Sequence, residues 1–245
     1  MNTATRQYSR IFLLSHMRAY TSLIGHILGS NPAINGYYEM HLSYDDPSTL
    51  DTQIAEYRRH DQIKRGSRYF FDKLLHNDYR PLPRARSPVS VKMLVSLREP
   101  EATIDSIIRL FSRKRQPGTY ASPEGATGYY IKRLEWLANF CRVTDHDYCY
   151  FDAGLITRSP DILLPALSHW LELAIPLSAE YQLFSQTGEK RKGDSSKTIY
   201  SGTIDTAHHD RTAMDLSEEL LAQANSAYRQ CRQTVATHAA KTHTL

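Results

Sequence analysis

Two stretches of the sequence place an arginine and hydroxyl side chains where an apolar run changes into a helical pattern. In the first, Arg18, Thr21 and Ser22 follow the apolar residues 11–14. A turn that leads from a strand into a helix exposes backbone N–H groups, and their partial positive charge suits a phosphate or sulfate. This stretch therefore indicates an anion site. Capping of a surface helix is the alternative, because Ser and Thr are common near helix starts.

The second stretch is the apolar run that ends at Arg98. Ser106 lies eight positions later, about two helical turns further on. An arginine with a nearby hydroxyl can bind one phosphate through charge-assisted hydrogen bonds. The alternative is that both residues are ordinary polar residues on the protein surface. A third stretch contains the basic residues Arg191 and Lys192, followed by Gly193. A run of charged residues is more often a solvated surface than a binding site.

Neither a standard nucleotide loop nor a metal site is indicated. The pattern G-x-x-x-x-G-K-[ST] is absent, because no glycine stands between residues 15 and 22. This argues against a kinase that uses ATP or GTP. His208, His209 and Asp210 are consecutive, and adjacent side chains rarely converge on one ion. We therefore expect no metal.

The elements that must position these residues follow an alternating order. Apolar or aromatic runs alternate with helical patterns, which predicts an α/β fold with a parallel sheet. The runs at 11–14 and 91–97 lack polar alternation, as in central strands covered on both faces by helices. Other strands are predicted at 33–36, 67–75 and 147–152. Helices are predicted at 21–28, after Pro100, and at 129–143, 159–173 and 215–231.

The composition indicates one soluble domain over residues 1–245, with 41% hydrophobic and 23% charged residues. A net charge of +4 favours an anionic small ligand and is too weak to indicate nucleic acid. The three cysteines have no metal-ligand spacing, and no apolar run approaches the roughly 18 residues of a membrane span. We expect a cytoplasmic protein without a membrane partner, and nothing specifies an oligomeric state. Active-site loops are predicted at 112–128 and 185–202.

Four stretches, in family order, resemble the sulfotransferases that use 3′-phosphoadenosine 5′-phosphosulfate (PAPS). Residues 18–22, RAYTS, stand where that family has [KR]-S-G-[ST]-[ST]. Residues 98–106, REPEATIDS, match the Arg-to-Ser spacing of its R-D-P-x-x-x-x-x-S element. Residues 150–178 resemble its Y-E-D-L region, and 191–204 resemble its late loop over the nucleotide. The resemblance implies a P-loop-NTPase-like three-layer fold with a central parallel sheet flanked by helices.

The resemblance also implies an activity, the transfer of a sulfuryl group from PAPS to a hydroxyl of a small molecule or carbohydrate. The products would be a sulfate ester and adenosine 3′,5′-bisphosphate, and no metal is required. The residues that would hold the 5′ end are Arg18, Ala19, Tyr20, Thr21 and Ser22. Those that would hold the 3′-phosphate are Arg98, Ser106, Arg191, Lys192 and Gly193.

One departure from the family pattern supports an alternative. Ala19 and Tyr20 replace the usual Ser-Gly, and that glycine lets the backbone approach a phosphate closely. Tyr20 needs an adjusted turn, or points outward toward the acceptor. The alternative is a catalytically impaired, sulfotransferase-like protein that binds a phosphonucleotide without transferring sulfate.

Three further residues complete the site that the resemblance implies. Glu39 is the expected base for the acceptor hydroxyl, and Lys73 is the second cation beside Arg18. Nearby cations keep a carboxylate deprotonated, as a base requires. His41 is the competing base, and on a strand it would share a face with Glu39. Structural roles for Glu39 and His41, and an exposed position for Lys73, are the alternatives. The acceptor is expected to meet residues 37–65 and 112–130.

Overall fold

A single sheet organises the computed structural model, which describes residues 7–189, 197–206 and 216–245. Its neighbouring strands are all parallel, in the order β2-β3-β1-β4-β5-β6. The strands are β1 (Ser9–Leu14), β2 (Ile34–Asn35), β3 (Tyr69–Leu74), β4 (Val91–Leu97), β5 (Tyr148–Asp152) and β6 (Lys241–His243). The predicted parallel sheet is therefore confirmed, and β6 is an addition at its edge.

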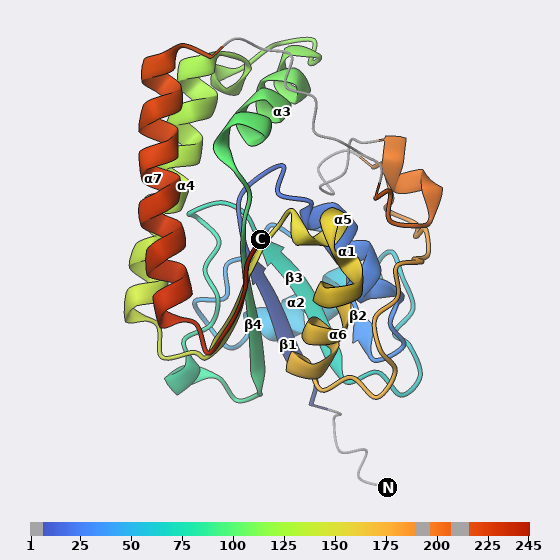
Figure 1. Ribbon diagram of the computed structural model, residues 1–245. Helices are drawn as coiled ribbons and strands as arrows, with labels where there is room; N and C mark the ends of the chain where they lie inside the picture. The colour runs from blue at the N-terminus through green and yellow to red at the C-terminus, as the bar shows by residue number, and fades with distance from the viewer. Residues whose placement is uncertain (1–6, 190–196, 207–215) are drawn as a thin grey trace, which may run out of the picture.

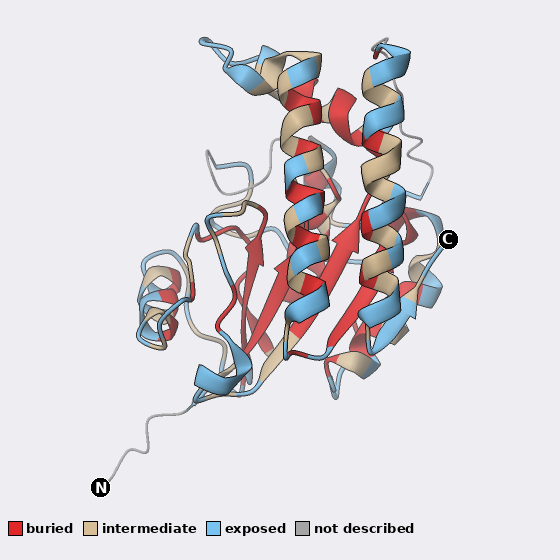
Figure 2. Ribbon diagram, turned by 90° about the vertical axis from the view of Figure 1, so that its left-hand side faces the viewer, coloured by how far each residue is buried: buried red, intermediate tan, exposed pale blue. Residues whose placement is uncertain are grey.

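Helices cover both faces of this sheet, which confirms the predicted three layers (Figure 1). One face carries α3 (Pro100–Ser112), α4 (Pro123–Val143) and α7 (Glu218–His238), and the last two run side by side (Figure 2). The other carries α1 (Thr21–Ser30), α5 (Leu155–Arg158) and α6 (Pro160–Trp170). The remaining helices are α2 (Thr49–Arg58) and the short 3₁₀ turns η1 (Arg84–Arg86), η2 (Thr119–Ala121) and η3 (Lys197–Ser201).

The central strand β1 shows why its sequence lacks polar alternation. Phe12 and Leu14 pack into the core beneath α3, α4 and α7. Ile11 and Leu13 point the opposite way, into the core beneath α1 and α6. All four side chains have no exposed surface. Both faces of the strand are covered, so every position is apolar, as the sequence predicted for a central strand.

The predicted loop at 112–128 is partly wrong, because α4 begins inside it at Pro123. Ser122 caps this helix, and its Oγ accepts a hydrogen bond of 3.1 Å from the N–H of Gly125. Proline at the first helical position follows the cap, a combination that starts helices. Two of the three glycines in this stretch, Gly125 and Gly128, lie within the first turns of α4. For the loop at 185–202, residues 190–196 lie outside the described part, and η3 forms its end.

Other boundaries also differ from the predictions. Helix α1 continues two residues beyond the predicted end at 28, and α7 spans 218–238 instead of 215–231. Neither α2 nor β6 was predicted. Helix α2 has a weak apolar pattern, and the three residues of β6 are mostly exposed. Their weak patterns explain why the sequence did not indicate them.

The carboxyl ends of the parallel strands meet at one edge of the sheet. The segments that follow β1, β2, β3 and β4 there begin at residues 15, 36, 75 and 98. Because β1 pairs with both β3 and β4, the segment after β1 lies between the segments after those strands. In open α/β sheets this is where ligands bind.

Candidate active site

The segment after β1 is a turn with two left-handed residues. Arg18 has a φ of 64° and Tyr20 has a φ of 55°. Tyr20 is also the N-cap of α1, and no side chain caps this helix start. A left-handed conformation costs a residue other than glycine about 1–2 kcal/mol. Tyr20 thus adopts the backbone conformation that glycine favours, at the position where the family pattern has glycine. The turn therefore keeps a glycine-like backbone at Tyr20 and is not adjusted to the larger residue.

The turn after β1 is joined to the end of β4 through what we call the arginine group, Arg18, Arg98 and Ser106. Arg18 Nε donates a hydrogen bond of 2.9 Å to Ser106 Oγ. Arg98 Nη1 donates to the Arg18 carbonyl at 2.5 Å, and its guanidinium lies 4.4 Å from the centre of the Tyr20 ring. The two arginines and the serine therefore lie together, and the residue that binds Ser106 is Arg18, which the sequence did not place with it. Two guanidinium groups so close attract an anion.

A second cation lies at the start of α1. Lys73 is on β3 with 1% of its surface exposed, so the alternative of an exposed lysine is wrong. Its Nζ lies 3.2 Å from Ser22 Oγ in the first turn of α1. Thr21 is buried in the same turn, and Ala19 is buried just before it. A lysine at a helix N-terminus adds to the positive end of the helix dipole, which favours an anion.

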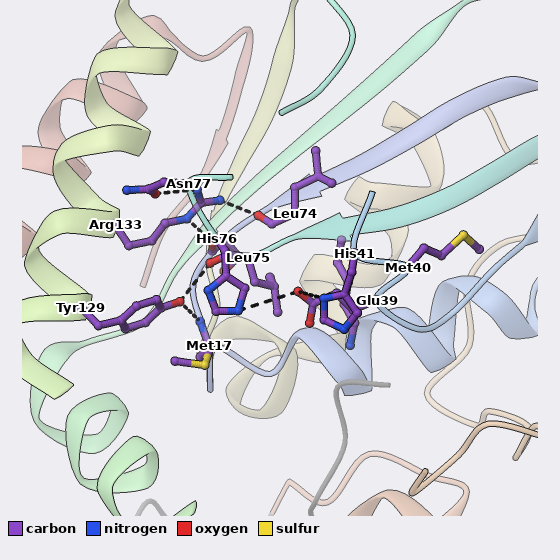
Figure 3. Close-up of polar contacts among 12 residues, drawn as sticks. Met17, Glu39, Met40, His41, Leu74, Leu75, His76, Asn77, Tyr129 and Arg133 are labelled. Atoms are coloured by element: carbon purple, nitrogen blue, oxygen red, sulfur yellow. Dashed lines mark hydrogen bonds and ion pairs between the residues drawn. The ribbon is translucent and has the colours of Figure 1, made fainter. Parts of the chain in front are cut away.

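The segment after β2 carries the buried carboxylate of Glu39, which has 5% of its surface exposed (Figure 3). Its Oε1 lies 3.5 Å from His41 Nδ1 and 3.9 Å from His76 Nε2. Among the described residues, Oε1 has no hydrogen-bond partner. A carboxylate oxygen held between two imidazoles, and not itself hydrogen-bonded, is suited to accept a proton.

Glu39 and His41 come together, but the expected reason, a shared strand face, is wrong. Strand β2 ends at Asn35, and His41 turns the chain with a φ of 56°. Asp72, buried on β3, fixes this segment. Its Oδ1 accepts a 3.0 Å hydrogen bond from the N–H of Met40, and its Oδ2 accepts a 2.7 Å hydrogen bond from the hydroxyl of Tyr44. Burial raises the pKa of Asp72 to about 7.

His76, which follows β3, was not identified from the sequence. The preceding residue is held by Tyr129 of α4, whose hydroxyl donates to the Leu75 carbonyl and accepts from the N–H of Met17, both at 2.9 Å (Figure 3). His76 also lines a cavity of about 570 Å³. The only available signal was the position of His76, just beyond a strand whose carboxyl end reaches the site.

Arg133 of α4 is buried behind this cluster and binds two strand ends. It donates to the carbonyl oxygens of Ser15 at 2.8 Å and Leu74 at 2.5 Å, and to the side chain of Asn77 at 3.0 Å. The segments that carry Arg18 and His76 are thereby fixed to the same helix.

His16 has a structural role in the turn after β1. Its Nδ1–H donates to the Met17 carbonyl at 2.9 Å, and its Nε2 accepts from the N–H of Arg98 at 3.1 Å. The ring has no exposed surface, and burial lowers its pKa to about 3. A neutral imidazole therefore joins the segments after β1 and β4.

The remaining predicted residues divide into two groups. Asp152, in the stretch that resembles the Y-E-D-L region, is an anchor: Arg232 donates two hydrogen bonds to it, at 2.9 and 2.7 Å, and the N–H of Leu245 donates a third at 2.9 Å. Outside the described residues lie Arg191, Lys192, Gly193, His208, His209 and Asp210. In the described ranges, no cluster of His, Cys, Asp and Glu is suited to hold a metal, and no helix is long and apolar enough to cross a membrane.

Two solved structures of other proteins share the fold of this chain. One is the sulfotransferase domain from the curacin biosynthetic pathway, with a TM-score of 0.58 and 16% identity over 91% of this chain and 99% of that one. Another is the sulfotransferase domain from the Synechococcus PCC 7002 olefin synthase, with a TM-score of 0.59 and 17% identity over 90% and 94%. No family model and no curated protein matches the sequence. The chain thus has the P-loop-like α/β fold of sulfotransferase domains, as the sequence resemblance implied.

The lowered pKa of His16 predicts a loss of stability in acid. Between about pH 6.5 and pH 3 the unfolded chain binds a proton that the folded chain does not, so the free energy of unfolding falls as the pH falls. This contribution is about 1.4 kcal/mol per pH unit, and His26, whose pKa burial lowers to about 4, adds to it. Urea unfolding at several pH values measures how the free energy of unfolding changes with pH. The slope of this free energy against pH should be shallower for His16→Gln than for wild type. The exposed substitution His169→Gln should keep the wild-type slope, and an unchanged slope in His16→Gln contradicts the assignment.

Contact between Glu39 and His76 predicts that the pKa of His76 depends on the charge of the Glu39 side chain. Burial holds the pKa of His76 below its usual value, and the carboxylate of Glu39 opposes that effect. The Glu39→Gln variant removes the negative charge and should therefore lower the pKa of His76 further. NMR titration of the imidazole measures this pKa. Glu101→Gln, which removes an equal charge from the first turn of α3, should leave it unchanged. A His76 pKa that stays the same or rises in Glu39→Gln excludes the contact.

Proposed function

We propose that this protein is a sulfotransferase that transfers the sulfuryl group of PAPS to a hydroxyl of a small molecule or carbohydrate. The observation that supports this most directly is the arginine group, in which Arg18, Arg98 and Ser106 meet beside the start of α1. The fold shared with sulfotransferase domains supports the same reaction class.

The residues present fit a donor with two separate anionic groups. The arginine group offers two guanidinium ions and a hydroxyl, which suit the 3′-phosphate. The start of α1 offers Thr21, Ser22 and the amino group of Lys73, which suit the 5′-phosphosulfate. Because Arg18 contacts Ser106, we assign its side chain to the 3′-phosphate, while its backbone remains part of the turn at the 5′ end. Arg191, Lys192 and Gly193 are proposed to add contacts to the 3′-phosphate.

The chain itself supplies a base and a positive field for the transfer. Bound PAPS would supply the sulfuryl group, and adenosine 3′,5′-bisphosphate, which keeps the bridging oxygen, would be the leaving group. Glu39 accepts the proton of the acceptor hydroxyl, and His41 is the alternative base. Lys73, on the neighbouring strand, stabilises the negative charge that develops at the start of α1. Each of these side chains follows or ends a strand at the same edge of the sheet.

The alternative is a protein that binds the phosphonucleotide without turnover, and Tyr20 is the residue that favours it. A side chain at the glycine position can hinder approach of a phosphate to the backbone. However, the ring of Tyr20 lies against the guanidinium of Arg98, and the turn keeps a glycine-like conformation. We therefore favour the active enzyme.

Calorimetric titration of adenosine 3′,5′-bisphosphate tests the donor site. Arg98→Ala should weaken binding by about 2 kcal/mol, because a hydrogen bond between charged groups is lost, and Ser106→Ala should weaken it less. Adenosine 5′-monophosphate should bind wild type more weakly, because it lacks the 3′-phosphate.

Arg113→Ala is the matched control, because it removes the same charge from an exposed position at the end of α3. It should bind like wild type. Absence of binding by wild type overturns both the sulfotransferase and the inactive alternative.

Replacing the base tests the transfer step. Glu39→Gln should lower kcat about 10²- to 10⁴-fold, the usual contribution of a general base. The affinity for adenosine 3′,5′-bisphosphate should change little, since Glu39 accepts a proton and does not hold the donor. Transfer of ³⁵S from labelled PAPS to an acceptor measures the rate, and Glu101→Gln is the control. Bisphosphate binding with no transfer by wild type to any acceptor favours the inactive alternative.

A further inference from the structure

The cavity of about 570 Å³ beside His76 is formed by two segments that are far apart in the sequence. His76 and Asp78 belong to the segment after β3, and Tyr120, Glu124 and Tyr129 belong to η2 and the start of α4. Of the two stretches expected to meet the acceptor, 112–130 lines this cavity and 37–65 does not.

Its lining is polar and aromatic. None of the described lining residues is Leu, Ile, Val, Met or Phe. Pockets for small apolar ligands are lined mainly by hydrophobic side chains, so this cavity is unsuited to them. Both carboxylates, Asp78 and Glu124, and the amine of Lys132 provide hydrogen-bonding groups of both charges. A hydroxyl group both donates and accepts hydrogen bonds, so a neutral ligand with many hydroxyl groups can bind both the carboxylates and the amine.

The tyrosines add flat surfaces to these polar groups. The rings of Tyr120 and Tyr129 are 5.2 Å apart and inclined by 55°. Such rings provide an apolar face and a polar tip, which matches the alternation of C–H faces and hydroxyl edges on a sugar ring. Gly128 leaves the adjoining surface of α4 open.

His76 connects the cavity to the proposed base. It lines the cavity, and its Nε2 is 3.9 Å from the oxygen of Glu39 that has no hydrogen-bond partner among the described residues. Glu39 does not itself line the cavity, so a hydroxyl presented by a ligand there would approach Glu39 past His76.

We infer that this cavity is the acceptor site and that it takes a neutral, hydroxyl-rich acceptor of the saccharide class. The inference rests on the proposed function, which supplies the sulfuryl donor. In the reaction a saccharide oxygen forms a bond to sulfur, and the bond from sulfur to the bridging oxygen of PAPS breaks. The hydroxyl proton passes to Glu39, and adenosine 3′,5′-bisphosphate leaves with the electron pair. His76 is a positioning residue that holds the carboxylate toward the cavity.

Gly128 permits a direct test of the site. A Cβ atom at this position would meet nothing within 4 Å, so a large side chain can enter the cavity without displacing a neighbour. Tryptophan also has a higher helix propensity than glycine. Gly128→Trp should therefore fold and block the cavity. Gly118→Trp is the matched control, because Gly118 is equally open and does not line the cavity.

The probes are the disaccharides cellobiose and N,N′-diacetylchitobiose, compared with the apolar phenols 2-naphthol and 4-nitrophenol. Saturation-transfer NMR measures their binding, and ³⁵S-labelled PAPS measures sulfate transfer. Wild type and Gly118→Trp should bind a disaccharide and sulfate it in preference to the phenols. Gly128→Trp should reduce both signals roughly tenfold or more, while all three proteins bind adenosine 3′,5′-bisphosphate equally.

A His76→Gln variant separates positioning from binding. It should lower kcat for the disaccharide with little change in KM, and added imidazole should restore part of the rate. Three results overturn the inference: preference for the phenols, no effect of Gly128→Trp, or no disaccharide binding by a wild type that binds the bisphosphate. Loss of bisphosphate binding by wild type would instead show that the proposed function itself is wrong.

Discussion

The buried guanidinium of Arg133 is the interaction on which the geometry of the site depends. Burial lowers its pKa to about 10, so the group remains charged at neutral pH. It donates hydrogen bonds to the carbonyl oxygens of Ser15 and Leu74, at the carboxyl ends of β1 and β3. Strand ends leave carbonyl groups without ladder partners, and burying such groups unpaired is costly. One cation of α4 therefore satisfies both strand ends and fixes the segments that follow them.

Each segment around the site is tied to another element in a similar way. The Tyr129 hydroxyl bridges the segments after β1 and β3, His16 bridges those after β1 and β4, and Asp72 holds the segment after β2 against β3. With Arg133, these residues make four anchors. Arg133, His16 and Asp72 are buried, and all four bond to backbone groups. Backbone contacts constrain a segment whatever side chains it carries. The proposed base Glu39 and the proposed second cation Lys73 can thus be charged without determining the path of the chain.

The layers of the fold were predictable because they depend on local pattern. The unbroken apolar run of β1 reflects burial on both faces. The spacing from Arg98 to Ser106 indicated a shared site, but the hydrogen bond from Arg18 to Ser106 joins residues that no local spacing connects. The position of His76 against Glu39 leaves no such pattern, because the two come from segments after different strands. Arg133 likewise has no sequence pattern that distinguishes it from the other charged residues of its helix. Only the folded chain shows that its partners are strand ends more than fifty residues away.

Tyr20 shows how a departure from a family pattern can be accommodated. Its left-handed backbone costs about 1–2 kcal/mol relative to glycine. A ring stacked on a guanidinium contributes about 0.5–2 kcal/mol, and the ring of Tyr20 lies 4.4 Å from Arg98. The two effects are of similar size, so the turn keeps its shape at little net cost. The same contact fixes Arg98 beside Arg18 before any ligand binds. A pre-positioned arginine loses less side-chain entropy when it grips a phosphate, so the residue that breaks the pattern also orders the proposed anion site.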